Sequence, residues 1–321
     1  MKASDFIYAP ALKEEFRCGV TLKDTRQVYL IDGRVQGASA PMSFRLKEGE
    51  SLDGTLQIIA VRKPDRMEEL EFSQNFDFAA GSRGRIVQCA HTSAPGRTVT
   101  REHITISIGA GASVEYTVMQ HEDNGSLHET SYNITLAEGA SLNMVFITLH
   151  GGVTGNRIKV SLDGRHADCS LSGLSLTDGD QTSDYAIELI HNQPECTSHQ
   201  LFKGILDNHG KSLFDGLIRV VPGAQKTEAY QADHNLLLSD TARAYSKPQL
   251  EIYADDVKCS HGATVGRLSE EELFYMRTRG ISLKEARLLQ QMAFAGEVLQ
   301  KISSPELRER MISMVERRLR G

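Results

Sequence analysis

A short turn formula recurs through most of the chain and limits what it can fold into. In four places a glycine is followed two residues later by serine and then by an apolar residue, at Gly49-Glu50-Ser51-Leu52, Gly111-Ala112-Ser113-Val114, Gly139-Ala140-Ser141-Leu142 and Gly210-Lys211-Ser212-Leu213. Glycine supplies a left-handed corner, serine bonds to the local backbone, and the apolar residue points inward. The copies are 62, 28 and 71 residues apart. This loose repeat indicates either strand–turn units stacked into a solenoid or a β-sandwich with many glycine turns.

Strand patterns surround these turns. The segment Thr98–Ile108 alternates apolar and polar residues, and Asn143–Leu149 is rich in residues that favour strands. Nearer the start, Val28–Val35 is typical of a hairpin that turns at Asp32-Gly33, whereas Lys13–Cys18 fits a helical turn. A mainly β region is therefore expected.

The chain changes character at Ser269, since only three of its 27 glycines lie in 269–321. Two capping-box patterns and a Ser-Pro pair predict three helix starts, at Ser269, Ser282 and Ser304, and Gly280 can close the first helix. Apolar residues recur on one face of the second helix at Leu288, Met292, Ala295, Leu299 and Ile302, and of the third at Leu307, Met311, Met314 and Val315. A helical unit therefore follows the β region.

Composition narrows the functional class. The 321 residues carry 36 Lys and Arg against 42 Asp and Glu, a net charge of −6, which disfavours general binding to nucleic acid or to anionic membranes. No apolar run approaches the roughly 18 residues of a membrane span, and the first residues lack the apolar core of a secretory signal. The five cysteines are scattered without a CxxC pair, which is typical of a reducing compartment. We expect a cytoplasmic protein.

Two apparent nucleotide motifs fail on spacing and context. The segment Gly204–Ser212 has five residues between its glycines, where a P-loop has four, and a strand-like run follows where a helix is needed. The fragment Ile108–Gly111 continues to Val114, where a dinucleotide fingerprint has a small residue. Neither an esterase elbow nor a zincin helix motif is present.

The segment before the helical tail carries the most chemical information. Residues 250–254 alternate as a strand, Asp255-Asp256 mark a turn, and Cys259 and His261 share one face of the next strand. A thiolate and an imidazole two residues apart suit Fe²⁺, Zn²⁺ or Cu⁺. Two ligands do not complete a metal site, so two other hypotheses stay open: a packed thiol beside a histidine bonded to a turn carbonyl, and a Cys259–His261 catalytic dyad.

Three ordered stretches resemble the SufB/SufD family of iron–sulfur cluster assembly: Ala229–Asp240, Pro248–Gly266 and Glu272–Ser282. The similarity is strongest from Ser212 to Ile302 and extends back to Arg85. Within the family the chain looks most like SufD. Cys259-Ser260-His261-Gly262 matches the SufD pattern, and Asp233 stands where SufB carries its cluster-building cysteine.

The resemblance implies a fold and its boundaries. A right-handed parallel β-helix core is expected over residues 85–268, followed by a C-terminal helical domain over 269–321. Residues 1–84 are expected to form a mixed N-terminal segment.

The resemblance also implies a role without catalysis. The chain is expected to be a scaffold subunit of the SUF machinery that pairs with a SufB-like subunit and docks a SufC-like ABC-type ATPase on its helical domain. Cys259 and His261 match positions near the subunit junction, and the histidine is the favoured contributor to cluster formation. A transient iron–sulfur cluster is expected in the complex, and no stably bound cofactor on the isolated chain.

Three alternatives compete with parts of this interpretation. A polysaccharide lyase on a β-helix would use Asp255-Asp256 with calcium. A homodimeric interaction module would need no metal and would use the same surface as the SufB-like partner. The tail helices would also have a purely structural role if they covered the open end of the solenoid.

Overall fold

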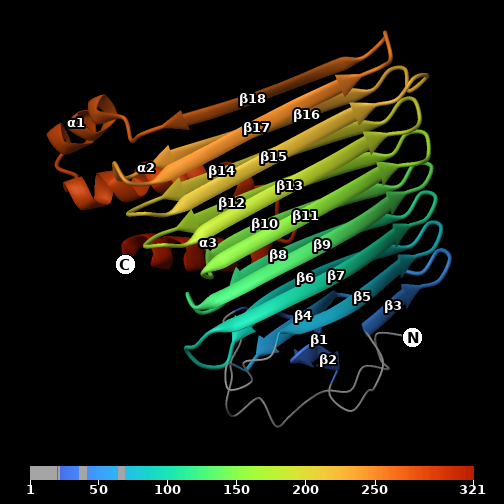
Figure 1. The fold of residues 1–321 in the computed structure, drawn as a ribbon, viewed down its shortest axis with the longest axis horizontal. Helices are drawn as coiled ribbons and strands as arrows, with labels where there is room; N and C mark the ends of the chain where they lie inside the picture. Colours follow the sequence, from blue (N-terminus) through green and yellow to red (C-terminus); the bar gives the residue numbers. More distant parts are fainter. Residues whose placement is uncertain (1–19, 21, 36–41, 64–68) are drawn as a thin grey trace.

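The computed structural model describes residues 20, 22–35, 42–63 and 69–321. After a hairpin within one sheet at the start, consecutive strands alternate between two sheets, so each pair of strands makes one coil of a parallel β-solenoid (Figure 1). The segment Lys13–Cys18, for which a helical turn was predicted, lies outside the described residues.

Each sheet grows by one strand per coil. In the described part of the chain, the larger sheet has the order β18 (Lys258–Gly266), β16 (Glu228–Leu237), β14 (Thr197–Leu206), β12 (Asp168–Thr177), β10 (Ser141–His150), β8 (Ser113–His121), β6 (Arg83–Thr92), β4 (Thr55–Arg62), β1 (Thr25–Ile31) and β2 (Arg34–Val35). The smaller sheet has the order β17 (Arg243–Ile252), β15 (Lys211–Val220), β13 (Thr182–His191), β11 (Val153–Leu162), β9 (Ser126–Leu136), β7 (Thr98–Ile108), β5 (Leu70–Phe78) and β3 (Met42–Leu46).

Parallel pairing decides between the two predicted β architectures. Neighbouring strands pair in parallel along both sheets, whereas a β-sandwich of the immunoglobulin type pairs them antiparallel. Side chains that meet on adjacent coils are about one coil apart in sequence, as for Ser113 and Ser141, 28 residues apart, and Glu228 and Lys258, 30 residues apart. The predicted β-solenoid is therefore confirmed.

The glycine turns form a ladder along one edge of the solenoid. Gly49, Gly81, Gly111 and Gly139 all have positive φ, and the backbone N–H of each donates to a carbonyl of the next coil at 2.8 Å. The prediction for Gly210 is wrong. Its turn lies on the opposite edge, between β14 and β15, and Asn208 takes the left-handed conformation there, with φ of 50°.

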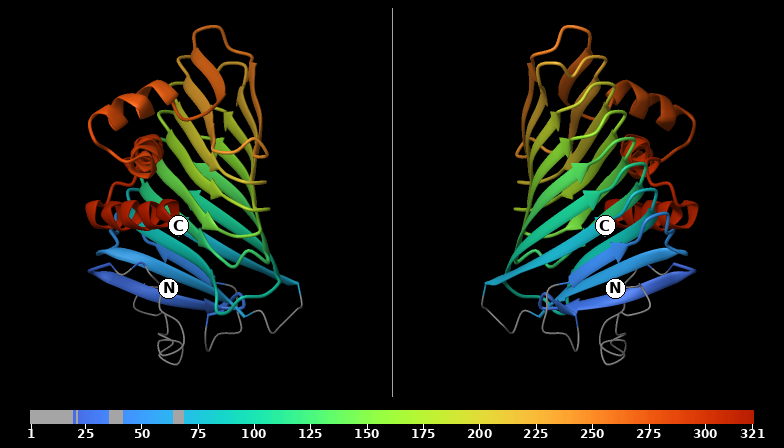
Figure 2. Two further views of the ribbon diagram at one scale, coloured as in Figure 1. Left: turned by 90° about the vertical axis from the view of Figure 1, so that its left-hand side faces the viewer. Right: turned by 90° about the vertical axis from the view of Figure 1, so that its right-hand side faces the viewer.

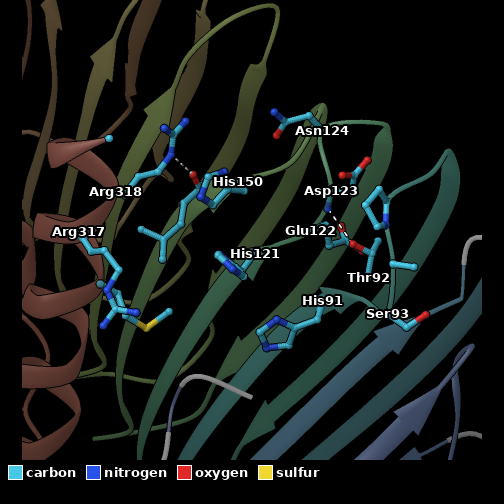
Figure 3. A pocket seen from close by; sticks show the side chains of 15 residues that line it. His91, Thr92, Ser93, His121, Glu122, Asp123, Asn124, His150, Arg317 and Arg318 are labelled. Carbon is cyan, nitrogen blue, oxygen red and sulfur yellow. Dashed lines mark hydrogen bonds between the residues drawn. The ribbon is translucent and has the colours of Figure 1, made fainter. Parts of the chain in front are cut away.

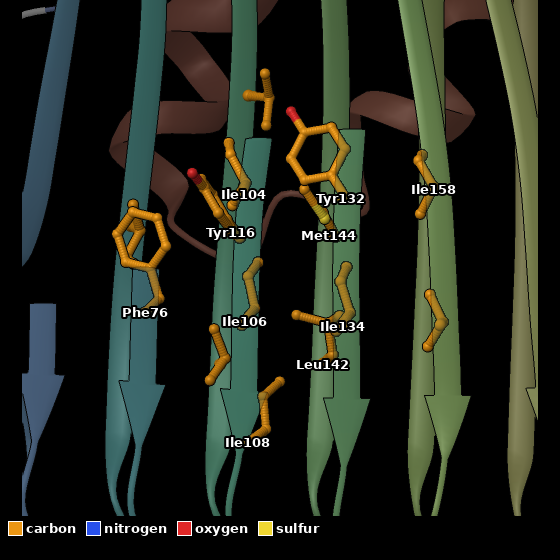
Figure 4. Packing of buried hydrophobic residues seen from close by; sticks show 14 of the residues in the cluster. Phe76, Ile104, Ile106, Ile108, Tyr116, Tyr132, Ile134, Leu142, Met144 and Ile158 are labelled. Atoms are coloured by element: carbon orange, nitrogen blue, oxygen red, sulfur yellow. The ribbon is translucent and has the colours of Figure 1, made fainter. Parts of the chain in front are cut away.

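The solenoid encloses an apolar core that is lined by alternate residues of every coil. Phe76, Ile106, Tyr116 and Phe146 are among its fully buried side chains. Figure 4 shows how residues of successive strands stack in columns across the two sheets. Because inward and outward positions alternate along a strand, each coil adds its own side chains to the same columns.

The three helices return along the flank of the larger sheet: α1 (Glu270–Thr278), α2 (Leu283–Leu299) and α3 (Pro305–Arg320) (Figure 2). Their predicted caps are confirmed, because Ser269, Ser282 and Ser304 each accept a backbone N–H of the first turn. Buried Leu299, Met311 and other residues of α2 and α3 pack on outward-facing apolar residues of the sheet. None of the described helices is long and apolar enough to span a membrane.

The helices therefore do not cap the solenoid, and that structural alternative is wrong. β18 and β17 lie at the end of their sheets, and Figure 1 shows α2 and α3 alongside earlier coils. α2 touches β12 and β14. In the part of the chain that the structure describes, no further coil follows the end formed by β17 and β18.

Both sheets continue on either side of residue 85, which is where the resemblance predicts the start of the β-helix core. β1, β3, β4 and β5 belong to the same two sheets as the later coils. The hairpin predicted for Val28–Val35 is confirmed, since β1 and β2 pair antiparallel and Asp32 and Gly33 both have positive φ.

Candidate functional site

The predicted Cys259 and His261 lie on β18, the last strand of the larger sheet. Cys259 pairs in register with Ala229 and His261 with Gln231, and both partners are buried in the lumen. The two side chains therefore belong to columns that face the inside of the solenoid. Because no coil follows β18 among the described residues, His261 is exposed and Cys259 is only half-buried.

The lumen becomes polar directly beneath this end. Gln231 donates to Gln200 on the preceding coil at 2.9 Å, and Asn235 donates to the Asp233 carboxylate at 2.8 Å. All four side chains are almost fully buried. Burial raises the pKa of Asp233 to about 6, although hydrogen bonds from Ser246 and Asn235 oppose the shift. This residue occupies the position at which the resemblance places a cysteine in SufB.

The Cys259 thiol is not activated by its surroundings. Burial raises its pKa, and a hydrogen bond with the backbone of Ala229 only partly opposes that effect. A catalytic dyad needs the opposite, because the thiolate is the nucleophile. A raised pKa is compatible with a thiol that loses its proton only when it binds a metal. Within the described residues, no three His, Cys, Asp or Glu side chains gather as a metal site.

The Asp255-Asp256 turn has a structural explanation. Both residues are exposed, and the backbone N–H of Asp256 donates to the side chain of Gln225 at 2.8 Å. The Asp256 carbonyl accepts from the backbone N–H of Lys226 at 2.5 Å. These contacts tie the turn to the preceding coil. The strand before the turn, β17, begins at Arg243 and thus earlier than predicted.

A second cluster was missed by the sequence analysis. His91 is the penultimate residue of β6, and His121 and His150 end β8 and β10, so the three rings stack on successive coils beside the end of α3 (Figure 3). Ring centroids are 5.7 Å apart for the first pair and 4.9 Å for the second. They line a cleft of about 740 Å³ together with Arg317 and Arg318. A spacing close to one coil was the only sequence signal for this cluster.

These features define a class: a parallel β-solenoid with helices on its flank and an uncovered end that presents a thiol and an imidazole. The chain belongs to the SufB/SufD family. The family model for the SufBD core domain of SUF system FeS cluster assembly matches residues 76–294.

Curated relatives agree with that assignment. The chain is 33% identical over 250 residues to the iron–sulfur cluster assembly protein SufD of Escherichia coli, which covers 78% of this chain and 59% of that protein. It is 28% identical over 293 residues to the chloroplastic protein ABCI7 of Arabidopsis thaliana, covering 91% of this chain and 60% of that protein. An iron–sulfur cluster assembly SufBD family protein of Synechocystis is 33% identical over 64% of this chain and 46% of its own length. The chain thus spans about half to three fifths of these relatives.

Proposed function

We propose that this chain is a non-catalytic scaffold subunit of a cytoplasmic SUF assembly that builds iron–sulfur clusters together with a SufB-like subunit. Family membership and the similarity to SufD support the general role. The observation that carries the proposal is the exposed His261 beside Cys259 on the last coil.

Pairing through the open end follows from the chemistry of sheet edges. β17 and β18 are terminal strands of two parallel sheets, and such strands carry backbone donors and acceptors that can pair with another chain. Ile252 and Val265 on these strands are 39% and 52% exposed. A SufB-like β-helix that adds its own strands would bury these side chains and enclose Cys259 and His261 in the interface.

The cluster is cargo in this proposal, held transiently at the junction and not stably by the isolated chain. Cys259 and His261 supply two ligands, and iron–sulfur clusters commonly take four protein ligands, so the partner supplies the others. The thiol must lose a proton and the imidazole must be neutral to bind iron, so loading weakens as pH falls.

The first helix is the proposed docking site for a SufC-like ATPase. On α1, Phe274 and Tyr275 are 69% and 59% exposed, whereas Leu273 is buried. On α2, Leu283 and Leu289 are also more than 40% exposed. Neighbouring large apolar side chains left exposed in this way are typical of a protein interface.

The competing functions have less support. Membership in the SufB/SufD family and the structural contacts of Asp256 remove the reasons to propose a polysaccharide lyase. A homodimer remains a second candidate, because two copies of this chain could meet through β17 and β18 when no SufB-like partner is present.

Reconstitution of the complete complex tests the role of His261. In the His261→Ala complex, retention of iron and sulfide should weaken by at least about tenfold. Loss of a residue that only supports a metal ligand already weakens metal binding by about 10- to 100-fold. Cys259→Ala should weaken the retention of iron and sulfide by a smaller factor. The control is Ser260→Ala, because that side chain lies between the two on the opposite face of β18. Wild-type loading of the His261→Ala complex would remove this residue from the mechanism.

A further inference from the structure

The cleft at the histidine stack combines five nitrogen-bearing side chains from four elements. His91, His121 and His150 come from three coils of the larger sheet, and Arg317 and Arg318 come from the last turn of α3 (Figure 3). Arg318 is held in place, because its Nε donates to the carbonyl of Leu149 at 3.1 Å. Arg317 makes no ion pair with the described residues.

The side-chain carboxylates around the cleft already have partners. The Glu122 carboxylate lies 2.9 Å from Nδ1 of His128. Asp123 accepts backbone N–H groups of Gly96 at 3.3 Å and Gly125 at 2.9 Å.

Asp178 accepts from the side chain of Asn208 at 2.6 Å and lies 3.5 Å from Arg318. The side-chain carboxylates around the cleft are therefore engaged by other groups, whereas Arg317 and the rings of His121 and His150 line it. Arg318 is shared with Asp178 at 3.5 Å and donates to the side chain of Gln181 at 3.4 Å.

We propose that this cleft binds a tetrahedral oxyanion, either free phosphate or the phosphate group of a small molecule, between the two arginines and the imidazoles of His121 and His150. Arginine recognises such oxyanions through its forked N–H donors. The Thr92 hydroxyl also lines the cleft, with its oxygen accepting from the Asp123 backbone N–H, so its proton can point to a ligand.

The imidazoles make binding dependent on protons. Burial, together with the charge of neighbouring groups that include Arg318, lowers the pKa of His121 and of His150 to about 4. Both rings are therefore neutral at pH 7 in the free protein. An anion placed against them favours the protonated form, so binding takes up protons and strengthens as pH falls.

The same charges argue against a metal ion at this stack. Neutral imidazoles are good ligands, but Arg318 lies close enough to His121 and His150 to depress both pKa values. A cation bound there would meet the same repulsion. The partly exposed, apolar side chain of Met314 in the lining favours an organic phosphate over the free ion, because it can contact the carbon skeleton.

Calorimetry on the full chain with sulfate tests the proposal, since sulfate keeps its charge across the useful pH range. Affinity should rise from pH 7.5 to 5.5, by up to about tenfold per pH unit for each proton taken up. Arg318→Met should weaken binding about tenfold. Arg310→Met, an exposed arginine of the same helix outside the cleft, should leave the affinity unchanged.

A double variant separates the anion site from its proton coupling. His121→Gln/His150→Gln should retain sulfate binding at pH 7.5 and lose the increase at pH 5.5, and circular dichroism verifies that each variant is folded. Phosphate and phenyl phosphate then distinguish the two sources: equal affinity indicates the free ion, and tighter binding of phenyl phosphate indicates an organic ester. Binding that Arg318→Met leaves intact, or histidine NMR shifts that respond to Zn²⁺ and not to sulfate, would overturn the proposal.

Discussion

Inside the solenoid, one buried histidine lies between two buried carboxylates. The ring of His128 lies 2.9 Å from Glu122 and 3.4 Å from Glu102, and all three side chains are at most 4% exposed. Burial alone would lower the pKa of His128, but the two carboxylates outweigh it and raise the pKa to about 10. Burial opposes ionisation of Glu122 too, yet His128 and Gln120 hold its pKa below the usual range.

Removing His128 should leave two buried carboxylates without their cation. We expect His128→Gln to lower the free energy of unfolding by about 3–5 kcal/mol, as for a broken buried ion pair. His103→Gln is the matched control, because the His103–Glu71 pair is exposed and exposed pairs contribute at most about 1 kcal/mol. Urea unfolding measures both changes.

The contribution of His128 to stability depends on pH in a definite direction. A histidine whose pKa is about 10 in the folded state and about 6.5 in the unfolded chain stabilises the fold fully below pH 6.5. That contribution is lost as pH rises through 10. The difference in stability between wild type and His128→Gln should therefore shrink from pH 7 to pH 10, and a constant difference would contradict a charged His128.

At the scale of elements, α1 differs from the two helices that follow it. α2 is anchored to the sheet by Lys203 of β14, whose ammonium pairs with Glu297, donates to the carbonyl of Phe294 at 3.3 Å and lies 4.4 Å from the Phe294 ring centroid. α1 buries a single residue, Leu273. α1 is therefore capped at its N-terminus but largely uncovered, as the proposed docking of a partner requires.

Adjacent residues on α1 should separate docking from stability. The double variant Phe274→Ser/Tyr275→Ser should lose ATPase retention in a pull-down with little change in the melting temperature, because both rings are exposed. Leu273→Ala should instead destabilise the chain by about 2–5 kcal/mol, because that side chain is 2% exposed. Full ATPase retention by the double variant would place the docking site elsewhere. Deleting 269–321 would be a poorer test, since it uncovers the flank of the sheet.

At the scale of the whole molecule, the solenoid is a one-dimensional stack in which each coil contacts its neighbours. The inward-facing columns therefore continue to the last coil, where no following coil covers them in the described part of the chain. Figure 2 shows that the helices lie to one side of this end. Because the end lacks a cap within the described residues, the proposed association with another chain would cover it.

A charge placed on the open end should block that association. Val265→Lys on β18 should abolish or strongly reduce pairing with a SufB-like subunit, and equally any homodimer, as measured by sedimentation. Val153→Lys on β11 is the control, because that valine is also exposed but belongs to a middle coil. Both variants should unfold at nearly the wild-type temperature. Equal pairing by the two variants would exclude the open end as the interface.

Several features were predictable because they depend on residues a few positions apart. The helix caps at Ser269, Ser282 and Ser304 and the turn at Asp32-Gly33 follow from local backbone chemistry, and all are confirmed. The irregular spacing of the turn formula also has a local cause. Gly81 is followed two residues later by Arg83 in place of serine. Later coils place non-glycine residues in the left-handed conformation, namely His166, Glu195 and Lys226.

The sequence by itself determined the strands, the helices and the shared face of Cys259 and His261, since each depends on contacts within one turn or one strand. Only the tertiary structure decided that this pair lies at an uncovered end and that α2 and α3 lie along the flank. It also brought His91, His121 and His150 together. Those placements depend on pairing between residues about 30 positions apart, and the register of that pairing is set by the length of every intervening turn.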